Sequence, residues 1–370
     1  MSHSSRRPLV LAVLFGGSSD EHEVSLRSAR AVLEHLDRDR YDVRPAGITR
    51  EGRWLSAQGS ERLLQGLDPG EPGGAPRLPV GTECVFPVLH GPGGEDGTVQ
   101  GWLQLLGMPF VGSDCAGAAA SMDKSFAKRV LRDAGLPVVP WTDVTREEWE
   151  AAPEGLVRRL LRERGLPCFV KPARLGSSIG ITRAETEDEL RAGLRRAFVH
   201  GRHALVEKAV GEARELEIAI LDGDDPVVSA PGEIVTANGW YDYAAKYESD
   251  DVELHVPAPD LPPRLADHFR EQALHAFRLL RMDGMARVDF LMDRKSGRAW
   301  VNEVNAIPGF TSISMFPRLL EHQGLSLGEV LDRLVALALQ RAHGRRAPRL
   351  PLETTEVEEE FGGAATASGR

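Results

Sequence analysis

The chain has 370 residues, of which 42% are hydrophobic, 27% charged and 6% aromatic, a composition typical of a globular protein with two or three domains. Its formal net charge is -10, so we expect no basic surface for polynucleotide phosphates and no nucleic-acid partner. Cys84, Cys115 and Cys168 lie far apart and form no CxxC pair. This spacing indicates reduced thiols rather than a zinc site or a disulfide framework.

The apolar run at 8–15 follows Arg6 and Arg7, an arrangement that resembles a signal peptide. The run is short, however, and passes directly into Gly16, Gly17 and acidic residues. No other stretch approaches the ~18 apolar residues of a membrane-spanning helix. We therefore expect a cytoplasmic protein without a membrane partner.

The first third of the chain alternates between apolar strands and amphipathic helices. The unbroken apolar run at 9–15 is typical of a buried parallel strand, and the apolar spacing at 25–36 is helical. Further strands are predicted at 42–48, 84–89 and 108–111, and a helix at 98–106. This alternation predicts an α/β domain with a parallel sheet.

The predicted secondary structure changes after two helices at 123–134 and 146–164. Short strands then dominate, with one helix at 187–198 between them, which predicts an α+β region with antiparallel pairing. The predicted strands are 168–171, 179–183, 204–210, 215–221 and 226–235.

A long helix is predicted from about residue 262, before strands at 285–292 and 299–304 that are joined by a turn at 294–297. Two more helices follow. The tail at 352–370 is rich in glutamate and small residues, a composition that predicts disorder.

The two strands near the C-terminal end gather polar side chains on one face. Period-two alternation places Arg287 and Asp289 together on the first strand, and Glu303 and Asn305 together on the second. Two carboxylates and an amide oxygen beside a guanidinium form a plausible Mg²⁺ site, which would keep water and substrate phosphates as further ligands. A solvated, salt-bridged hairpin explains the spacing equally well.

Phosphate-binding groups must be sought outside a P-loop, because no lysine follows a glycine and the Walker pattern is absent. Lys171 ends a predicted strand and precedes the small-residue loop from Gly176 to Gly180, whose N–H groups could surround phosphates. Such a loop is more often a simple hairpin turn. Lys246, in the sequence YDYAAKY, could bring another positive charge on a lid.

Two further segments follow the ends of apolar strands, where ligands bind in α/β sheets. GGSSDEHEVS contains Glu21, and HGPGGEDG begins with His90, so the two side chains could share one crevice. A lone histidine at such a position is more often structural. GxGxxG is absent, which argues against a dinucleotide-binding oxidoreductase.

Seven motifs occur in the order, and close to the wording, of D-alanine:D-alanine ligases of the ATP-grasp superfamily. They span residues 9–342 and read GGSSDEHEVS, HGPGGEDGTVQG, SMDK, VKPARLGSSIG, YDYAAKY, ARVDF and VNEVNAIPGFTSIS. The resemblance implies a mixed α/β and α+β protein with an ATP-grasp fold and an N-terminal parallel-sheet α/β domain. We expect the N-terminal domain at 1–120 on the side of the first substrate, a central ATP-grasp subdomain at 121–211, a C-terminal ATP-grasp domain at 212–345 with the metal and second-substrate sites, and a disordered tail at 346–370.

The resemblance also implies roles for individual residues. The nucleotide would be bound by phosphate-contacting Lys124 and Lys171, by Lys246 at the transferred γ-phosphate, by Glu207, Lys208 and Val210 at adenine, and by Glu215 at the ribose. Two Mg²⁺ ions, or Mn²⁺, would be held by Asp289, Glu303 and Asn305. The first D-alanine would meet Glu21, His90, Ser177 and Tyr247; Arg287 and Gly309 would form an oxyanion site; Ser314 and Met315 would bind the second D-alanine.

The implied reaction uses ATP to convert one D-alanine into an acyl phosphate, which the amine of a second D-alanine attacks. The product would serve peptidoglycan precursor synthesis, and a homodimer is expected. Ala306 stands where the family usually has Thr or Ser. The alternatives are a D-alanine:D-lactate or D-alanine:D-serine ligase and, in another class, a non-catalytic ATP-binding regulatory protein. Tyr247 within YDYAAKY favours the dipeptide ligase.

Overall fold

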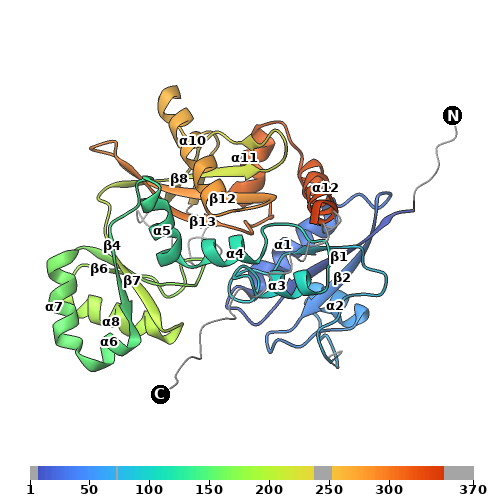
Figure 1. Ribbon diagram of the computed structural model, residues 1–370, viewed down its shortest axis with the longest axis horizontal. Helices are drawn as coiled ribbons and strands as arrows, with labels where there is room; N and C mark the ends of the chain where they lie inside the picture. The colour runs from blue at the N-terminus through green and yellow to red at the C-terminus, as the bar shows by residue number, and fades with distance from the viewer. Residues whose placement is uncertain (1–6, 72–73, 237–251, 346–370) are drawn as a thin grey trace, which may run out of the picture.

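A computed structural model describes residues 7–71, 74–236 and 252–345. Three separate β-sheets follow one another along the chain, each with its own helices (Figure 1). Lys246, Tyr247 and the tail at 346–370 lie outside the described residues. Within the ranges described, no helix has both the length and the apolar character needed to cross a membrane.

The N-terminal sheet is parallel, as predicted, with β1 at its centre. Its order is β2-β1-β3, and its strands are β1 (Leu9–Gly16), β2 (Tyr41–Ile48) and β3 (Cys84–Pro87). Helices α1 (His22–His35), α2 (Ala57–Leu64) and α3 (Thr98–Leu105) accompany them. β1 ends at Gly16, where φ is 90° and an added Cβ would lie 2.1 Å from the carbonyl oxygen of Ile48. Only glycine fits this turn, which directs the chain toward Glu21.

Some predicted elements of this region are wrong. The strand expected at 108–111 is only an isolated parallel bridge between Val85 and Phe110, and β3 ends at Pro87 rather than at Leu89. Two helices, α2 and α4 (Cys115–Met122), were not predicted; α4 consists of small residues, which give no amphipathic period. α5 (Lys124–Asp133) was predicted and begins after the capping residue Asp123.

The central sheet is antiparallel throughout, as predicted, in the order β4-β7-β5-β6. Its strands are β4 (Trp141–Thr145), β5 (Cys168–Pro172), β6 (Thr182–Ala184) and β7 (His203–Lys208), and its helices are α6 (Arg146–Ala151), α7 (Pro153–Glu163) and α8 (Glu187–Val199). The single helix expected at 146–164 is divided, because the residue before Pro153 cannot stay helical without a clash. β4 was not predicted, and β6 begins later than the strand expected at 179–183.

The third sheet has the order β11-β10-β8-β12-β13, and β9 pairs with β8. Its strands are β8 (Ala213–Leu221), β9 (Val227–Val228), β10 (Gly232–Thr236), β11 (Val252–His255), β12 (Met285–Asp293) and β13 (Ala299–Asn305). Helices α10 (Pro263–Leu279), α11 (Met315–His322) and α12 (Leu327–Arg345) complete this part. The strand expected at 226–235 is two strands separated by Pro231, which has no N–H for a sheet ladder.

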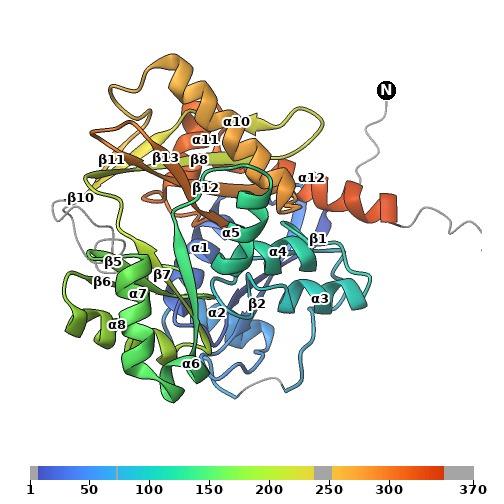
Figure 2. The ribbon, with the colours of Figure 1, turned by 60° about the vertical axis from the view of Figure 1, so that its left-hand side comes forward.

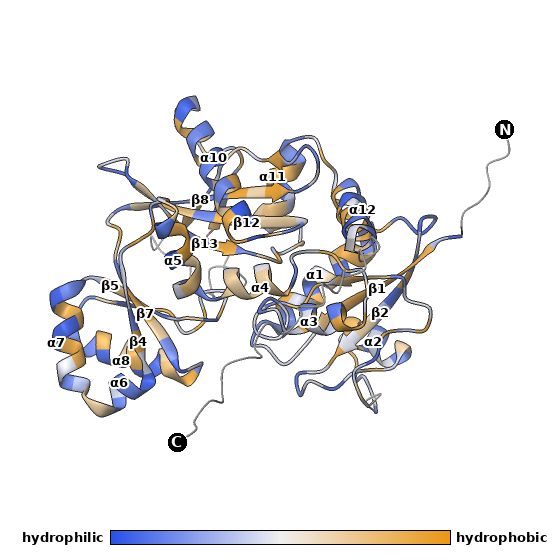
Figure 3. Ribbon diagram, in the orientation of Figure 1, coloured by the Kyte–Doolittle hydropathy of each residue, from blue (hydrophilic) through white to orange (hydrophobic). Residues whose placement is uncertain are grey.

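The sheets are stabilised by apolar side chains buried beneath their helices. α7 and α10 show both blue and orange segments in Figure 3, as expected for helices with one buried face. Figures 1 and 2 agree that the central sheet and the third sheet are distinct layers, linked in sequence by the chain between β7 and β8. Polar residues at the facing ends of these layers form the candidate site.

Candidate active site

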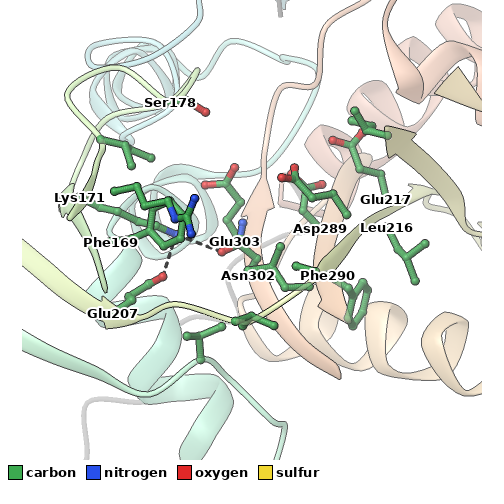
Figure 4. Close-up of a pocket in the computed structure, with 18 of the residues that line it drawn as sticks. Phe169, Lys171, Ser178, Glu207, Leu216, Glu217, Asp289, Phe290, Asn302 and Glu303 are labelled. Carbon is green, nitrogen blue, oxygen red and sulfur yellow. Dashed lines mark hydrogen bonds and ion pairs between the residues drawn. The ribbon is translucent and has the colours of Figure 1, made fainter. Parts of the chain in front are cut away.

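A cavity of about 450 Å³ lies between the central and third sheets (Figure 4). Its walls come from β5 and β7 on one side and from β8, β12 and β13 on the other. All the described residues that the family resemblance assigned to the nucleotide line it, namely Lys124, Lys171, Glu207, Lys208, Val210 and Glu215. Asp289 and Glu303, two of the three predicted metal ligands, line it as well.

The basic side of this cavity is organised around Glu207. The Nζ atom of Lys171 lies 2.7 Å from Oε2 of Glu207 and 3.2 Å from Oδ1 of Asn302, the interactions dashed in Figure 4. The Nζ atom of Lys128 lies 3.0 Å from Oε1 of Glu207. Burial by itself would raise the pKa of Glu207, but the two lysines outweigh it and lower that pKa. Glu207 is therefore a charged acceptor on the cavity wall.

Lys124 connects this basic side to the acidic one. Its Nζ atom donates a hydrogen bond of 2.6 Å to the carbonyl oxygen of Leu175, which directly precedes the small-residue loop, and lies 3.4 Å from Oε2 of Glu303. Asp123 caps α5 by accepting from the N–H of Phe126, which fixes the helix start and therefore the position of Lys124.

The acidic side is the hairpin of β12 and β13. In its register Asp289 is the direct partner of Glu303, and Arg287 is the partner of Asn305. Figure 4 shows the carboxylates of Asp289 and Glu303 pointing the same way. Asp289 accepts from Arg287 at 2.7 Å at each oxygen, and from Nδ2 of Asn305 at 3.0 Å. The short turn thus produced the convergence that the alternation predicted.

The donor chemistry of this hairpin fits a hard divalent cation. The described residues contain no group of three or more His, Cys, Asp or Glu side chains that could hold a metal ion. The candidate ligands of the hairpin are two carboxylates, those of Asp289 and Glu303, and the amide oxygen of Asn305. Mg²⁺ prefers oxygen ligands and is usually held by only one or two carboxylates, with phosphates completing its shell. Asp289 and Glu303 meet that requirement beside a cavity large enough for phosphates.

A second cavity of about 90 Å³ adjoins the first, and Glu303 lines both. It gathers segments that are distant in sequence: the loop before α1, the loop after β3, the loop after β5 and the start of α11. Every described residue that the resemblance assigned to the two amino-acid substrates lines it, namely Glu21, His90, Ser177, Arg287, Gly309, Ser314 and Met315. Asn305 lines it too. Tyr247, the remaining prediction, lies outside the described residues.

The part of this second cavity around Glu21 contains buried titratable groups. Ser177 donates a hydrogen bond to Glu21, and Ser177 has a φ of 49°, a left-handed conformation that a non-glycine residue adopts at a cost. Nε2 of His90 lies 3.0 Å from Oγ of Ser28, and burial lowers the pKa of His90 to about 4. Burial and the nearby charge of Glu21 raise the pKa of Glu95 to about 8. His90 is therefore neutral at pH 7, and it lines this cavity together with Glu21 and Glu95.

Three residues of the site were missed by sequence reasoning. Lys128 follows Lys124 by one helical turn, and Glu217 follows Glu215 on the same strand face, so periodicity contained a signal for both. Glu95 accepts from the N–H groups of Gly91 and Ile307 and had only its place in HGPGGEDG to indicate it.

Two sheets with a nucleotide-sized cavity between them, lysines on one wall and a carboxylate hairpin on the other, define an ATP-grasp enzyme. The N-terminal model of D-Ala–D-Ala ligases matches residues 10–113, and the C-terminal model matches residues 130–336. The chain belongs to the D-alanine–D-alanine ligase family.

Individual relatives agree with this assignment. The D-alanine–D-alanine ligase of Deinococcus radiodurans is 47% identical over 349 residues, covering 90% of this chain and 99% of that protein. The D-alanine–D-alanine ligase of Heliobacterium modesticaldum is 43% identical over 92% of this chain and 99% of its own length.

Solved structures show the same fold. The D-alanine–D-alanine ligase of Coxiella burnetii has a TM-score of 0.78 at 33% identity, over 92% of this chain and 96% of its own. A D-Ala:D-Ser ligase of Enterococcus faecalis has a TM-score of 0.77 at 34% identity, over 90% of this chain and 100% of its own. The fold is therefore shared by relatives with different second substrates.

Proposed function

We propose that this protein uses ATP to join two D-alanine molecules into D-alanyl-D-alanine for peptidoglycan precursor synthesis. The observation that carries the proposal is the pair of adjoining cavities, one nucleotide-sized and one amino-acid-sized, with Glu303 on both walls. A phosphoryl group on a nucleotide in the larger cavity would point toward a carboxylate in the smaller one.

The larger cavity would bind ATP. Lys124 and Lys171 supply positive charge to its phosphates, while Glu207, Lys208 and Val210 surround adenine and Glu215 meets the ribose hydroxyls. Lys246, assigned to the γ-phosphate by the resemblance, lies outside the described residues. Compact lysine charges suit a phosphoryl group whose negative charge is spread over several oxygens.

Two Mg²⁺ ions, which Mn²⁺ can replace, would be held by Asp289, Glu303 and Asn305. When bound, they neutralise phosphate charge during transfer. Glu303 also lies 3.4 Å from Lys124, so the protein itself keeps a cation beside this carboxylate.

The first D-alanine would occupy the smaller cavity with its ammonium group at Glu21, which Ser177 orients by a hydrogen bond. Its carboxylate oxygen attacks the γ-phosphorus of ATP, the bond to the β-phosphate oxygen breaks, and ADP leaves. The product is an acyl phosphate, a far better acyl donor than the carboxylate. Its location in a buried cavity limits hydrolysis by water.

The second D-alanine would place its carboxylate at Ser314 and the N–H of Met315, at the N-terminus of α11, where unpaired N–H groups favour an anion. Its free amine attacks the acyl carbon. The tetrahedral intermediate carries a negative oxygen, which Arg287 and the N–H of Gly309 stabilise, and it collapses to the dipeptide and inorganic phosphate.

The wider organisation follows from the same proposal. We assign the three sheets to domains at 1–120, 121–211 and 212–345, with first-substrate contacts in the first and nucleotide contacts in the other two. A cytoplasmic location suits an ATP-consuming enzyme with three unpaired cysteines. A homodimer is proposed as well, and the exposed Leu105 and Leu106 at the end of α3 are apolar surface that a second copy would cover.

The test is product analysis by mass spectrometry after incubation with ATP, Mg²⁺ and equal concentrations of D-alanine, D-serine and D-lactate. We expect D-alanyl-D-alanine as the main product, with one ADP and one phosphate per dipeptide. A predominance of D-alanyl-D-lactate or D-alanyl-D-serine would reassign the second substrate. Nucleotide binding without any release of ADP would instead identify a regulatory protein.

A further inference from the structure

Lys128 is a buried cation that the proposed mechanism does not use. Only 1% of its surface is exposed, although it lies in the middle of α5. Lysine is almost never fully buried without a partner, because removing its charge from water is costly. Its Nζ atom lies 3.0 Å from Oε1 of Glu207 and 6.0 Å from the centre of the Trp141 ring.

Glu207 is held by two lysines on different elements. Lys128 of α5 contacts Oε1, and Lys171 of β5 contacts Oε2 at 2.7 Å. Glu207 itself is 1% exposed, so both ion pairs are shielded from solvent. Each carboxylate oxygen therefore has its own cation.

The two lysines differ in their access to the cavity. Lys171 and Glu207 line it, whereas Lys128 is not among the described residues that do. Lys171 also lies 3.2 Å from Oδ1 of Asn302. Because Lys171 is a proposed phosphate ligand, bound phosphates will compete with Glu207 for the positive charge of Lys171. Lys128 has no such competitor and remains as a counter-ion behind Glu207.

With adenine at Glu207, as proposed above, the charge of this carboxylate determines which purine base binds more tightly. An ionised carboxylate only accepts hydrogen bonds, and adenine offers a donor in its 6-amino group. A purine with a carbonyl at position 6 would place an acceptor there and leave a buried group unpaired, which lowers affinity. A protonated or displaced Glu207 would lose this preference.

We propose that Lys128 is a positioning residue that keeps Glu207 charged and fixed as the acceptor for the 6-amino group of adenine. Lys128 itself touches neither base nor phosphate. This inference rests on the proposed placement of adenine at Glu207.

The test compares ATP with inosine triphosphate, which has a carbonyl at position 6, in wild type and in Lys128→Met. We expect Lys128→Met to raise KM for ATP about tenfold, to change kcat less than threefold, and to leave KM for inosine triphosphate nearly unchanged. The preference for ATP thus falls about tenfold, equivalent to about 1.4 kcal/mol. Lys128→Arg retains the charge and is expected to restore part of the preference. Arg129→Met, which changes the exposed neighbour on α5, is the matched control and is expected to leave it unchanged.

A merely structural role would give a different pattern. The proposal would be overturned if Lys128→Met raised KM for ATP and for inosine triphosphate equally. It would also be overturned if Lys128→Arg lost as much of the ATP preference as Lys128→Met. If Lys128→Met does not fold, Glu207→Gln tests the proposal instead. An unchanged preference for ATP over inosine triphosphate in that variant would show that Glu207 is not the acceptor for adenine, and the proposed role of Lys128 would be wrong. In the double variant Lys128→Met with Glu207→Gln, the preference should be no lower than in Glu207→Gln alone.

Calorimetric binding of ADP and inosine diphosphate separates this inference from the proposed function. These measurements need no D-alanine turnover, so they remain informative if the wild type ligates another substrate. ADP bound no more tightly than inosine diphosphate by the wild type would overturn the role of Lys128. Failure of dipeptide synthesis with normal ADP preference would overturn only the ligase assignment.

Discussion

Arg287 of β12 and Glu217 of β8 form an ion pair across adjacent strands, with 2.9 Å between Nε and Oε2. Asp289 accepts from the same guanidinium. Burial acts against the charge of Arg287, but Asp289 and Glu217 outweigh it and raise its pKa well above the ordinary value. The guanidinium is therefore a fixed, permanent cation on the wall of the smaller cavity.

We predict that Arg287→Met lowers kcat by about 100- to 1000-fold, the range observed when one oxyanion donor is lost. KM for ATP should change less than about threefold, because Arg287 lies at the amino-acid cavity. An ADP-release assay measures both constants. Arg298→Met, on the exposed turn between β12 and β13, is the control. Unimpaired kcat in Arg287→Met would remove the oxyanion role.

Glu303→Gln tests the hairpin. It preserves shape while removing a charge that faces Asp289 across the strand pair, so we predict loss of turnover on the order of 100-fold or more with an intact fold. ADP release at increasing Mg²⁺ gives the activity, and circular dichroism gives the fold. Glu253→Gln, an exposed change on β11, should behave as wild type. Normal dipeptide synthesis by Glu303→Gln would exclude Glu303 from metal binding.

Gly176→Ala tests the first-substrate site through steric contact. An added Cβ would lie 2.9 Å from Oε2 of Glu21, closer than such atoms approach, so Glu21 must move. We predict a KM for D-alanine at least about tenfold higher, with ADP affinity unchanged. Gly201→Ala has open space around its Cβ and is the matched control. Equal effects of the two substitutions would argue against Glu21 as the ammonium anchor.

The lowered pKa of His90 predicts that the free energy of unfolding decreases in acid. Its folded-state pKa is about 4, below its ordinary value of 6.5, so only the unfolded chain takes up a proton as the pH falls below 6.5. This contribution to stability is present above pH 6.5 and is lost toward pH 4, by about 3 kcal/mol in total.

Urea denaturation at pH 7 and pH 5 measures this loss. His90→Gln should show a smaller decrease in unfolding free energy than wild type, whereas His268→Gln, an exposed change on α10, should match wild type. Glu95 acts in the opposite direction, since its raised pKa of about 8 stabilises the fold as the pH falls from 8 to about 4.5. It is present in all three proteins, so their difference isolates His90.

Local patterns predicted correctly how the strands that carry the candidate site are built and paired. The alternation in β12 and β13 placed Asp289 opposite Glu303 because side-chain direction in a strand has a period of two and a short turn leaves few registers. The apolar run of β1 indicated a parallel strand because such strands are covered on both faces. Where local patterns were weak, as in the small-residue helix α4, prediction failed.

The amino-acid sequence by itself determined which residue types stand at each strand end and on each strand face, because those properties depend on neighbours only a few positions away. Only the tertiary structure decided that Lys128 meets Glu207, or that Glu95 accepts from the N–H of Ile307, since these partners are separated by long stretches of chain. Their charges and hydrogen bonds acquire their strength from shared burial between packed layers, and burial is a property of the assembled fold.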